Sequence, residues 1–114
     1  MNIQIFGRKK SSSTKKAERF FSERRIKYHL VDLDEKPVSR GEMEAIYSGM
    51  DIKEDLIDKE SKLYKSKYAY LKFDIFEELS SNQEMLRLPI VRNGKKVTAG
   101  DQPEVWKKMI DVEK

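Results

Sequence analysis

Asn2-Ile-Gln-Ile-Phe6, which leads into Ser11-Ser-Ser-Thr14, is the stretch that decides the fold. Polar and apolar residues alternate in its first part, and this alternation is typical of a short strand. From Thr14 onward apolar residues recur at helical spacing, which predicts an amphipathic helix. Those apolar residues are Ala17, Phe20, Phe21 and Ile26. The chain is therefore expected to open with a strand and a helix.

A second strand and a second helix are predicted next. Tyr28-His-Leu-Val-Asp32 fits a strand, and because a helix precedes it, we expect it to lie parallel to the first strand. Ser39 followed by Glu42 is a capping-box pattern that predicts a helix start, and Gly49 is expected to end that helix. Further helical turns are predicted over residues 51–56 and 59–72, and one more helix over residues 74–86.

The end of the chain predicts a hairpin and a last helix. Pro89-Ile-Val-Arg92 and Lys95-Lys-Val-Thr-Ala99 flank Asn93-Gly94, the pair that favours a type I′ turn between antiparallel strands. Asp101, with Pro103 in the first turn, predicts the start of a helix. Its expected apolar stripe consists of Val105, Trp106, Met109 and Ile110, with Trp106 as the core anchor.

Together these elements predict one α/β domain over residues 1–114. The order is βαβ, a helical insert over about residues 36–86, and ββα. This is the order of a thioredoxin-like fold, in which helices cover both faces of a four-stranded mixed sheet. A chain of 114 residues is long enough to bury a small core.

Composition excludes several kinds of chemistry. The chain has no cysteine and one histidine, which rules out disulfides, thiolate metal sites and thiol catalysis and predicts a metal-free protein. Neither a signal-like segment nor an apolar run of about 20 residues is present, so we expect a cytoplasmic protein with no membrane partner. Lys and Arg dominate residues 1–30, whereas Asp and Glu dominate residues 31–60.

The motifs resemble those of the arsenate reductase and Spx family of thioredoxin-fold proteins. Phe6, followed by Ser11-x-x-Thr14-Lys-Lys-Ala17, resembles the family's aromatic residue and Cys-x-x-Cys or Cys-x-x-Ser motif. Three further segments resemble its helical insert: Lys36-Pro-Val-Ser39, Asp51-Ile-Lys-Glu-Asp-Leu56 and Ser61-Lys-Leu-Tyr-Lys65. Leu88-Pro-Ile-Val91 resembles its Arg-Pro-Ile-Val segment, and the resemblance implies a cis peptide bond before Pro89, which faces the active site.

The chain departs from that family at the residues that carry its chemistry. Ser11 stands where the catalytic cysteine is expected, and Thr14 stands where Spx-type members have their second cysteine. Leu88 replaces an oxyanion-binding arginine, and Glu60 falls near another. Because guanidinium groups are strong bidentate donors to oxyanions, their loss predicts that oxyanion binding is lost too.

Two interpretations remain for the start of the first helix. Free amides and the helix dipole make Ser11, Ser12, Ser13 and Thr14, beside Lys10 and Pro89, a candidate anion- or thiol-binding site. The alternative is that these hydroxyls only cap the helix. Lys9, Lys15 and Lys16 would also favour an anion, whereas Arg87 and His29 are expected to lie at the surface.

Three functions follow from this resemblance and its departures. The first is a redox-inactive protein that binds a protein partner through the basic first helix and the acidic insert, as an Spx-like regulator contacting RNA polymerase would. The second is a glutathione-dependent transferase in which Ser11 stabilises the thiolate of the cofactor. The third is retained arsenate reduction. No nucleic-acid partner is expected, because no recognition motif is present.

Overall fold

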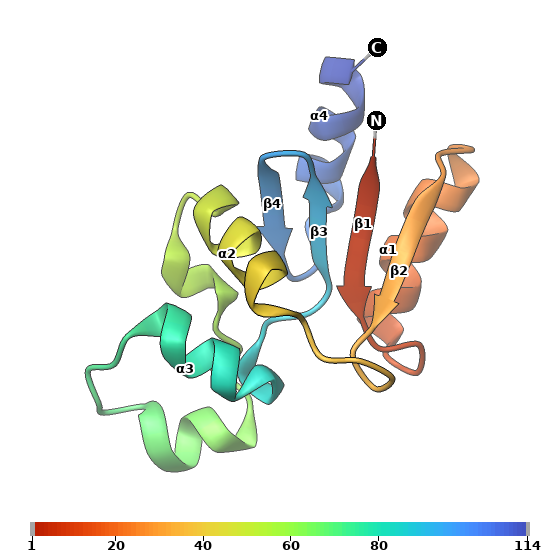
Figure 1. Cartoon of the computed structure of the whole chain (residues 1–114). Coiled ribbons are helices and arrows are strands. Elements are labelled where there is room, and N and C mark those ends of the chain that lie inside the picture. Colours follow the sequence, from red (N-terminus) through yellow and green to blue (C-terminus); the bar gives the residue numbers. More distant parts are fainter. Residues whose placement is uncertain (1, 114) are drawn as a thin grey trace.

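A four-stranded mixed sheet forms the centre of the computed structural model, which describes residues 2–113 (Figure 1). The strand order is β2-β1-β3-β4, with β1 parallel to β2 and β3 antiparallel to both β1 and β4. The strands are β1 (Ile3–Gly7), β2 (Tyr28–Asp32), β3 (Ile90–Asn93) and β4 (Lys96–Ala99). This arrangement confirms the predicted thioredoxin-like sheet and the parallel pairing of its first two strands.

Helices cover both faces of the sheet, as the sequence predicts. On one face, α1 (Ser12–Glu23) and α4 (Pro103–Glu113) pack against the alternate residues Ile3 and Ile5 of β1. Trp106 is buried there and donates a hydrogen bond from Nε1 to Thr98 Oγ1 at 2.9 Å, so it is the predicted core anchor. On the other face, Phe6 packs within the core that includes α2 (Arg40–Gly49).

The insert between β2 and β3 contains α2 and several shorter elements. These are η1 (a 3-10 turn, Lys53–Leu56), η2 (a π-helical turn, Tyr64–Tyr68), α3 (Ile75–Ser81) and η3 (a 3-10 turn, Gln83–Met85). The capping box that starts α2 is confirmed: Glu42 N–H donates to Ser39 Oγ and Ser39 N–H donates to Glu42 Oε1.

The prediction of one helix over residues 74–86 is wrong. The chain leaves the helical conformation at Asn82, where φ is −130° and ψ is 69°. Beyond that break, the side-chain amide of Gln83 accepts from Val38 N–H at 2.7 Å and donates to Val38 C=O at 2.8 Å. Leu86 then forms a β-bridge with Ile57. Contacts with distant backbone therefore override the local helical pattern.

The C-terminal hairpin forms, but its turn differs from the predicted type I′ turn. Asn93 pairs with Lys96, so the two loop residues are Gly94 and Lys95. Gly94 has φ of +60°, and Lys95 is not in the positive-φ region. A type I′ turn needs positive φ at both loop positions, whereas type II′ needs it only at the first. The positive φ at Gly94 therefore fits type II′.

The last helix also differs from its prediction in two details. It begins at Pro103, whose preceding residue, Gln102, accepts the first helical hydrogen bond from Trp106 N–H at 3.0 Å. Asp101 lies one residue too early to act as the cap. Val105 is exposed, so the apolar stripe consists of the three other predicted residues.

Candidate functional site

The N-terminus of α1 lies beside the segment that enters β3. Ser11 is the N-cap of α1, with φ of −77° and ψ of 130°, and its hydroxyl accepts a hydrogen bond from Thr14 N–H at 3.5 Å. Ser13 Oγ donates to Leu88 C=O at 3.5 Å across the gap between the two segments. The Leu88-Pro89 peptide bond is cis, which confirms the sequence prediction. The structure thus brings Ser11, Ser13 and Pro89 together.

The two serine hydroxyls at this site hydrogen-bond to each other. Ser11 Oγ and Ser13 Oγ lie 2.9 Å apart. A hydroxyl has a single proton to donate. Ser13 Oγ also lies 3.5 Å from Leu88 C=O, and Ser11 Oγ lies 3.5 Å from Thr14 N; either serine can be the donor in the shorter bond between them. Both hydroxyls therefore have partners within the protein, which favours the helix-cap interpretation; anion binding here stays a prediction.

Thr14 has a structural role that the sequence did not reveal. Its side chain is buried, and Oγ1 accepts a hydrogen bond from Arg8 N–H at 3.1 Å. A methyl group placed on Gly7 would come within 2.7 Å of Thr14 Cγ2, so the last residue of β1 must be glycine for Thr14 to fit. The hydroxyl at the position of the expected second cysteine thus holds the β1–α1 loop.

Several of the basic side chains near the start of α1 are paired with carboxylates. Lys9 lies 3.7 Å from Glu35, and Lys16 lies 3.8 Å from Asp101. Arg8 Nη1 lies 2.5 Å from Asp34 Oδ1. The side chains of Lys10, Ser12 and Lys15 are exposed. Neither of these two lysines takes part in a described ion pair. The positive charge that could attract an anion is smaller than the sequence suggests.

The described residues at the positions of the expected oxyanion-binding arginines do not supply guanidinium groups at Ser11. Leu88, the residue before the cis-proline, packs partly buried against the core. Arg87 lines a separate 320 Å³ pocket whose wall includes Glu54, Asp55 and Asp58. Glu60 forms an ion pair with Lys65 at 2.9 Å. Arg87 therefore lies among carboxylates and does not replace the missing guanidinium at Ser11.

Among the described residues, none that hydrogen-bonds to the Ser11 hydroxyl is a general base. A serine needs a general base within hydrogen-bond reach, but the side-chain partners described for Ser11 are a hydroxyl and a backbone N–H. His29 is exposed on the edge strand β2, opposite Gln4. In residues 2–113, no cluster of three or more potential His, Cys, Asp or Glu ligands is found.

A second surface, which the sequence analysis missed, lies at the end of the insert. Tyr70 is 100% exposed and Leu71 is 56% exposed, in the loop that joins η2 to α3. The signal that could have found it is charge: residues 61–73 hold four lysines and no Asp or Glu. The insert was expected to be acidic, and it is acidic up to about residue 60, but it is basic over residues 61–73.

The clear pKa shift in this part of the molecule belongs to a buried tyrosine. Tyr68 donates a hydrogen bond from its hydroxyl to Glu78 Oε1 at 2.6 Å. The hydrogen bond to that carboxylate, together with burial, raises the pKa of Tyr68 above its ordinary value. Tyr68 therefore stays neutral and anchors the insert.

Comparison with known proteins identifies the relatives of this chain. The model of the ArsC family matches residues 6–109. An arsenate reductase from Vibrio cholerae has a TM-score of 0.80 at 18% identity, over 95% of this chain and 97% of that one. An ArsC family related protein from Bacteroides fragilis has a TM-score of 0.78 at 21% identity, over 96% and 98%.

A more distant neighbour extends the likeness to redoxins. The glutaredoxin-like NrdH-redoxin from Escherichia coli has a TM-score of 0.52 at 16% identity, over 96% of this chain and 95% of that one. No curated protein sequence gives a significant match. Within the described residues, no helix is both long and apolar enough to cross a membrane.

Proposed function

The chain belongs to the ArsC family, and we propose that it acts by binding a protein partner rather than by thiol chemistry. The observation that carries this proposal is the chain of hydrogen bonds from Thr14 N–H through Ser11 and Ser13 to Leu88 C=O. It occupies the place of the family's reactive thiol, and each hydroxyl in it is bonded within the protein. The site that would perform reduction instead supports the fold.

The surroundings of Ser11 support the same proposal. Reduction of an oxyanion needs a nucleophile that attacks it and donors that bind its oxygens. Ser11 has no base, and the position before Pro89 carries the aliphatic Leu88. Restoring a thiol alone should therefore not restore the reaction.

The experiment compares the parent protein with Ser11→Cys in arsenate reduction assays. Glutathione with glutaredoxin and, separately, thioredoxin supply electrons, and a cysteine-containing arsenate reductase is the positive control. We expect no turnover from either protein. The new thiol should nevertheless react rapidly with alkylating reagents, because helix N-termini lower thiol pKa values to about 7.5 or below. Turnover by the parent protein would overturn the proposal.

The partner remains to be identified. RNA polymerase is the first candidate, because the sequence resembles that of Spx as well as that of arsenate reductase. Surface-immobilised protein and purified RNA polymerase from the same organism allow a direct binding measurement. The expected cytoplasmic location is compatible with this partner and stays a prediction.

A glutathione-dependent transferase is the second candidate function. One observation favours it: Ser11 and Ser13 lie at a helix N-terminus beside a cis-proline, in a fold shared with a glutaredoxin-like protein. Glutathione would supply the thiol that the chain lacks. This function requires glutathione to bind at Ser11, and the thermal measurement that closes the Discussion tests that binding.

A further inference from the structure

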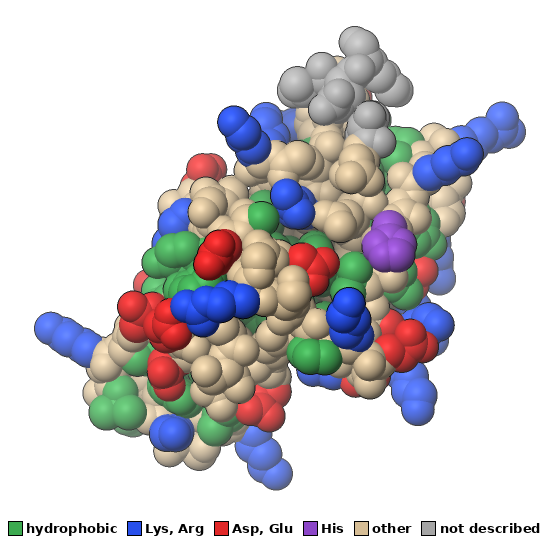
Figure 2. Space-filling model, viewed as in Figure 1, with side chains coloured by type: hydrophobic (Ala, Val, Ile, Leu, Met, Phe, Trp, Pro, Cys, Tyr) green, Lys and Arg blue, Asp and Glu red, His purple; other side chains and the backbone are tan. Residues whose placement is uncertain are grey.

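The end of the insert presents two apolar side chains to solvent. We name residues 61–73 the insert tip. Figure 2 shows hydrophobic side chains at the surface of this end of the molecule, with basic side chains projecting beside them. Tyr70 is fully exposed and Leu71 more than half exposed. Tyrosine is among the residues enriched at binding hot spots, and Leu71 adds exposed apolar area beside it.

The loop that carries these two side chains is fixed on both sides. Tyr68 is only 3% exposed, and its ring contacts that of Phe73 edge-on at 4.9 Å between centroids. Leu71 N–H donates to Tyr68 C=O at 3.1 Å. Because residues 68 and 73 pack in the core, Tyr70 and Leu71 are held outward between them. Such preorganisation lowers the entropy lost on binding.

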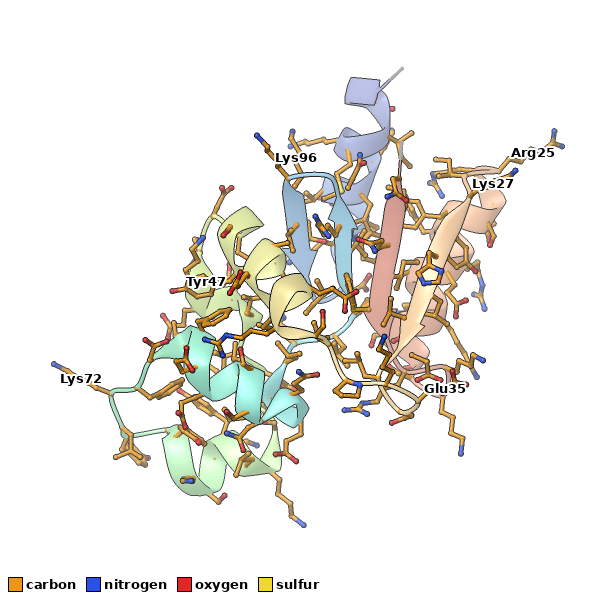
Figure 3. The ribbon with its side chains drawn as sticks, in the orientation of Figure 1. Arg25, Lys27, Glu35, Tyr47, Lys72 and Lys96 are labelled. Carbon is orange, nitrogen blue, oxygen red and sulfur yellow. The ribbon has the colours of Figure 1, made fainter. Side chains whose placement is uncertain are left out.

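The insert tip itself carries only positive charge. The insert tip contains Lys62, Lys65, Lys67 and Lys72 and no acidic residue. Lys65 pairs with Glu60, whereas Lys62, Lys67 and Lys72 form no ion pair among the described residues. Figure 3 shows Lys72 pointing away from the body of the molecule. Unpaired positive charge around an apolar centre complements an acidic rim around an apolar pocket.

We infer that the insert tip is the docking surface for the proposed protein partner, and that the partner's contact region is acidic with an apolar pocket. This inference rests on the proposed function and specifies where and what the protein binds. Leu71 favours a protein over a nucleic acid, because bases stack on aromatic rings but offer little burial to an aliphatic side chain. Two apolar residues without an amphipathic helix are also a weak membrane anchor.

The experiment selects ligands from a phage library of random linear peptides on the full-length protein. Peptides that also bind the Tyr70→Ser/Leu71→Ser variant are discarded. We expect the remaining peptides to combine Asp or Glu with aromatic or aliphatic residues. A synthetic peptide of that sequence should bind the parent protein about tenfold or more tightly than the double variant.

Two further variants sharpen the measurement. Ile52→Ser removes another exposed apolar side chain, 60% exposed and outside the insert tip, and should leave peptide affinity unchanged. Lys67→Gln/Lys72→Gln should weaken binding, and more so at low salt, where charges are screened least. The circular dichroism spectrum of each variant confirms that it is folded.

Three outcomes would overturn the inference. They are the recovery of no peptide that depends on Tyr70 and Leu71, the enrichment of basic peptides, and tip-dependent binding to phosphatidylserine vesicles or single-stranded DNA in place of peptide. Each of these leaves the proposed function standing, because a partner can dock on another surface. Arsenate turnover would instead overturn the proposed function without changing what the peptides show.

Discussion

The N-terminus of α1 and the insert tip differ in the direction in which their functional groups point. At α1, the side chains of Ser11, Ser13 and Thr14 form hydrogen bonds within the protein. At the insert tip, Tyr70 and Leu71 face solvent while their neighbours are buried. The first region has its hydroxyls bonded within the protein. The second presents its apolar side chains to solvent.

If the proposed function holds, this difference teaches that a fold can keep the geometry of an active site without its thiol chemistry. The cis peptide bond before Pro89 and the helix start at Ser11 are both present. Without a thiol or an arginine, that geometry holds two segments together. Substitutions near α1 should therefore change stability, whereas substitutions at the insert tip should change binding.

The largest effect is expected from Gly7→Ala. The added methyl group would press against buried Thr14, and overpacking of this kind costs about 1–3 kcal/mol. Gly41→Ala is the matched control, because a methyl group there meets nothing within 4 Å inside α2; it should stabilise by about 0.5–1 kcal/mol. Urea unfolding measures both. An unchanged midpoint for Gly7→Ala would remove Thr14 from the structural account.

A comparable but smaller loss is expected from Thr14→Val. Valine keeps the shape of threonine but leaves Arg8 N–H without its partner, at a cost of about 1–3 kcal/mol for a fully buried donor. Arg8 is only partly buried, so the lower end of that range applies. Thr14→Ser keeps the hydroxyl, and its loss should come from the missing methyl group alone. If Thr14→Val is as stable as the parent protein, the hydrogen bond from Arg8 N–H does not stabilise the fold.

A pH-dependent effect is expected from Tyr68→Phe, which removes the hydrogen bond to Glu78 and should make the protein less stable than the parent below about pH 10. The fold raises the pKa of Tyr68, so its contribution to stability is complete below the unfolded pKa of about 10 and disappears as pH rises through the folded pKa. Parent protein should therefore lose stability above pH 10 more steeply than the variant. Urea titrations measure the unfolding free energy of both proteins across that pH range. If the two free energies fell in parallel, this anchoring role would be contradicted.

The smallest effect on stability is expected at the insert tip. Tyr70→Ser/Leu71→Ser removes side chains that face solvent, so unfolding free energy should change by less than about 0.5 kcal/mol per substitution. Thermal melting compares the variant with the parent. A large loss would mean that these side chains pack in solution, and it would end the contrast between the two regions.

The sequence predicted the strands and the capping box well because their signals are local. Alternation in β1 and the Ser39–Glu42 spacing depend on neighbouring residues alone. The break at Asn82 could not be predicted, because Gln83 bonds to the backbone of Val38, 45 residues away. The burial of Thr14 likewise depends on Gly7 across a loop, and the exposure of Tyr70 depends on where Tyr68 and Phe73 pack.

The sequence predicted where the candidate site lies, and its role stays a prediction. Ser11, Ser13 and Pro89 meet as the resemblance implies, yet sequence alone could not tell a helix cap from an anion site, since both use the same hydroxyls and amides. The contacts of Ser11 and Ser13 within the protein favour the cap interpretation, and anion binding stays a prediction.

Thermal melting of the parent protein and Ser11→Ala, with arsenate, sulfate or glutathione at constant ionic strength, tests the central claim most directly. A ligand that binds only the native state raises the melting temperature by mass action. We predict that none of the three ligands does so, and that Ser11→Ala is less stable by about 0.5–2 kcal/mol in every buffer, as for a lost helix cap. A ligand-dependent rise that Ser11→Ala abolishes would contradict the claim and establish a binding site at the start of α1.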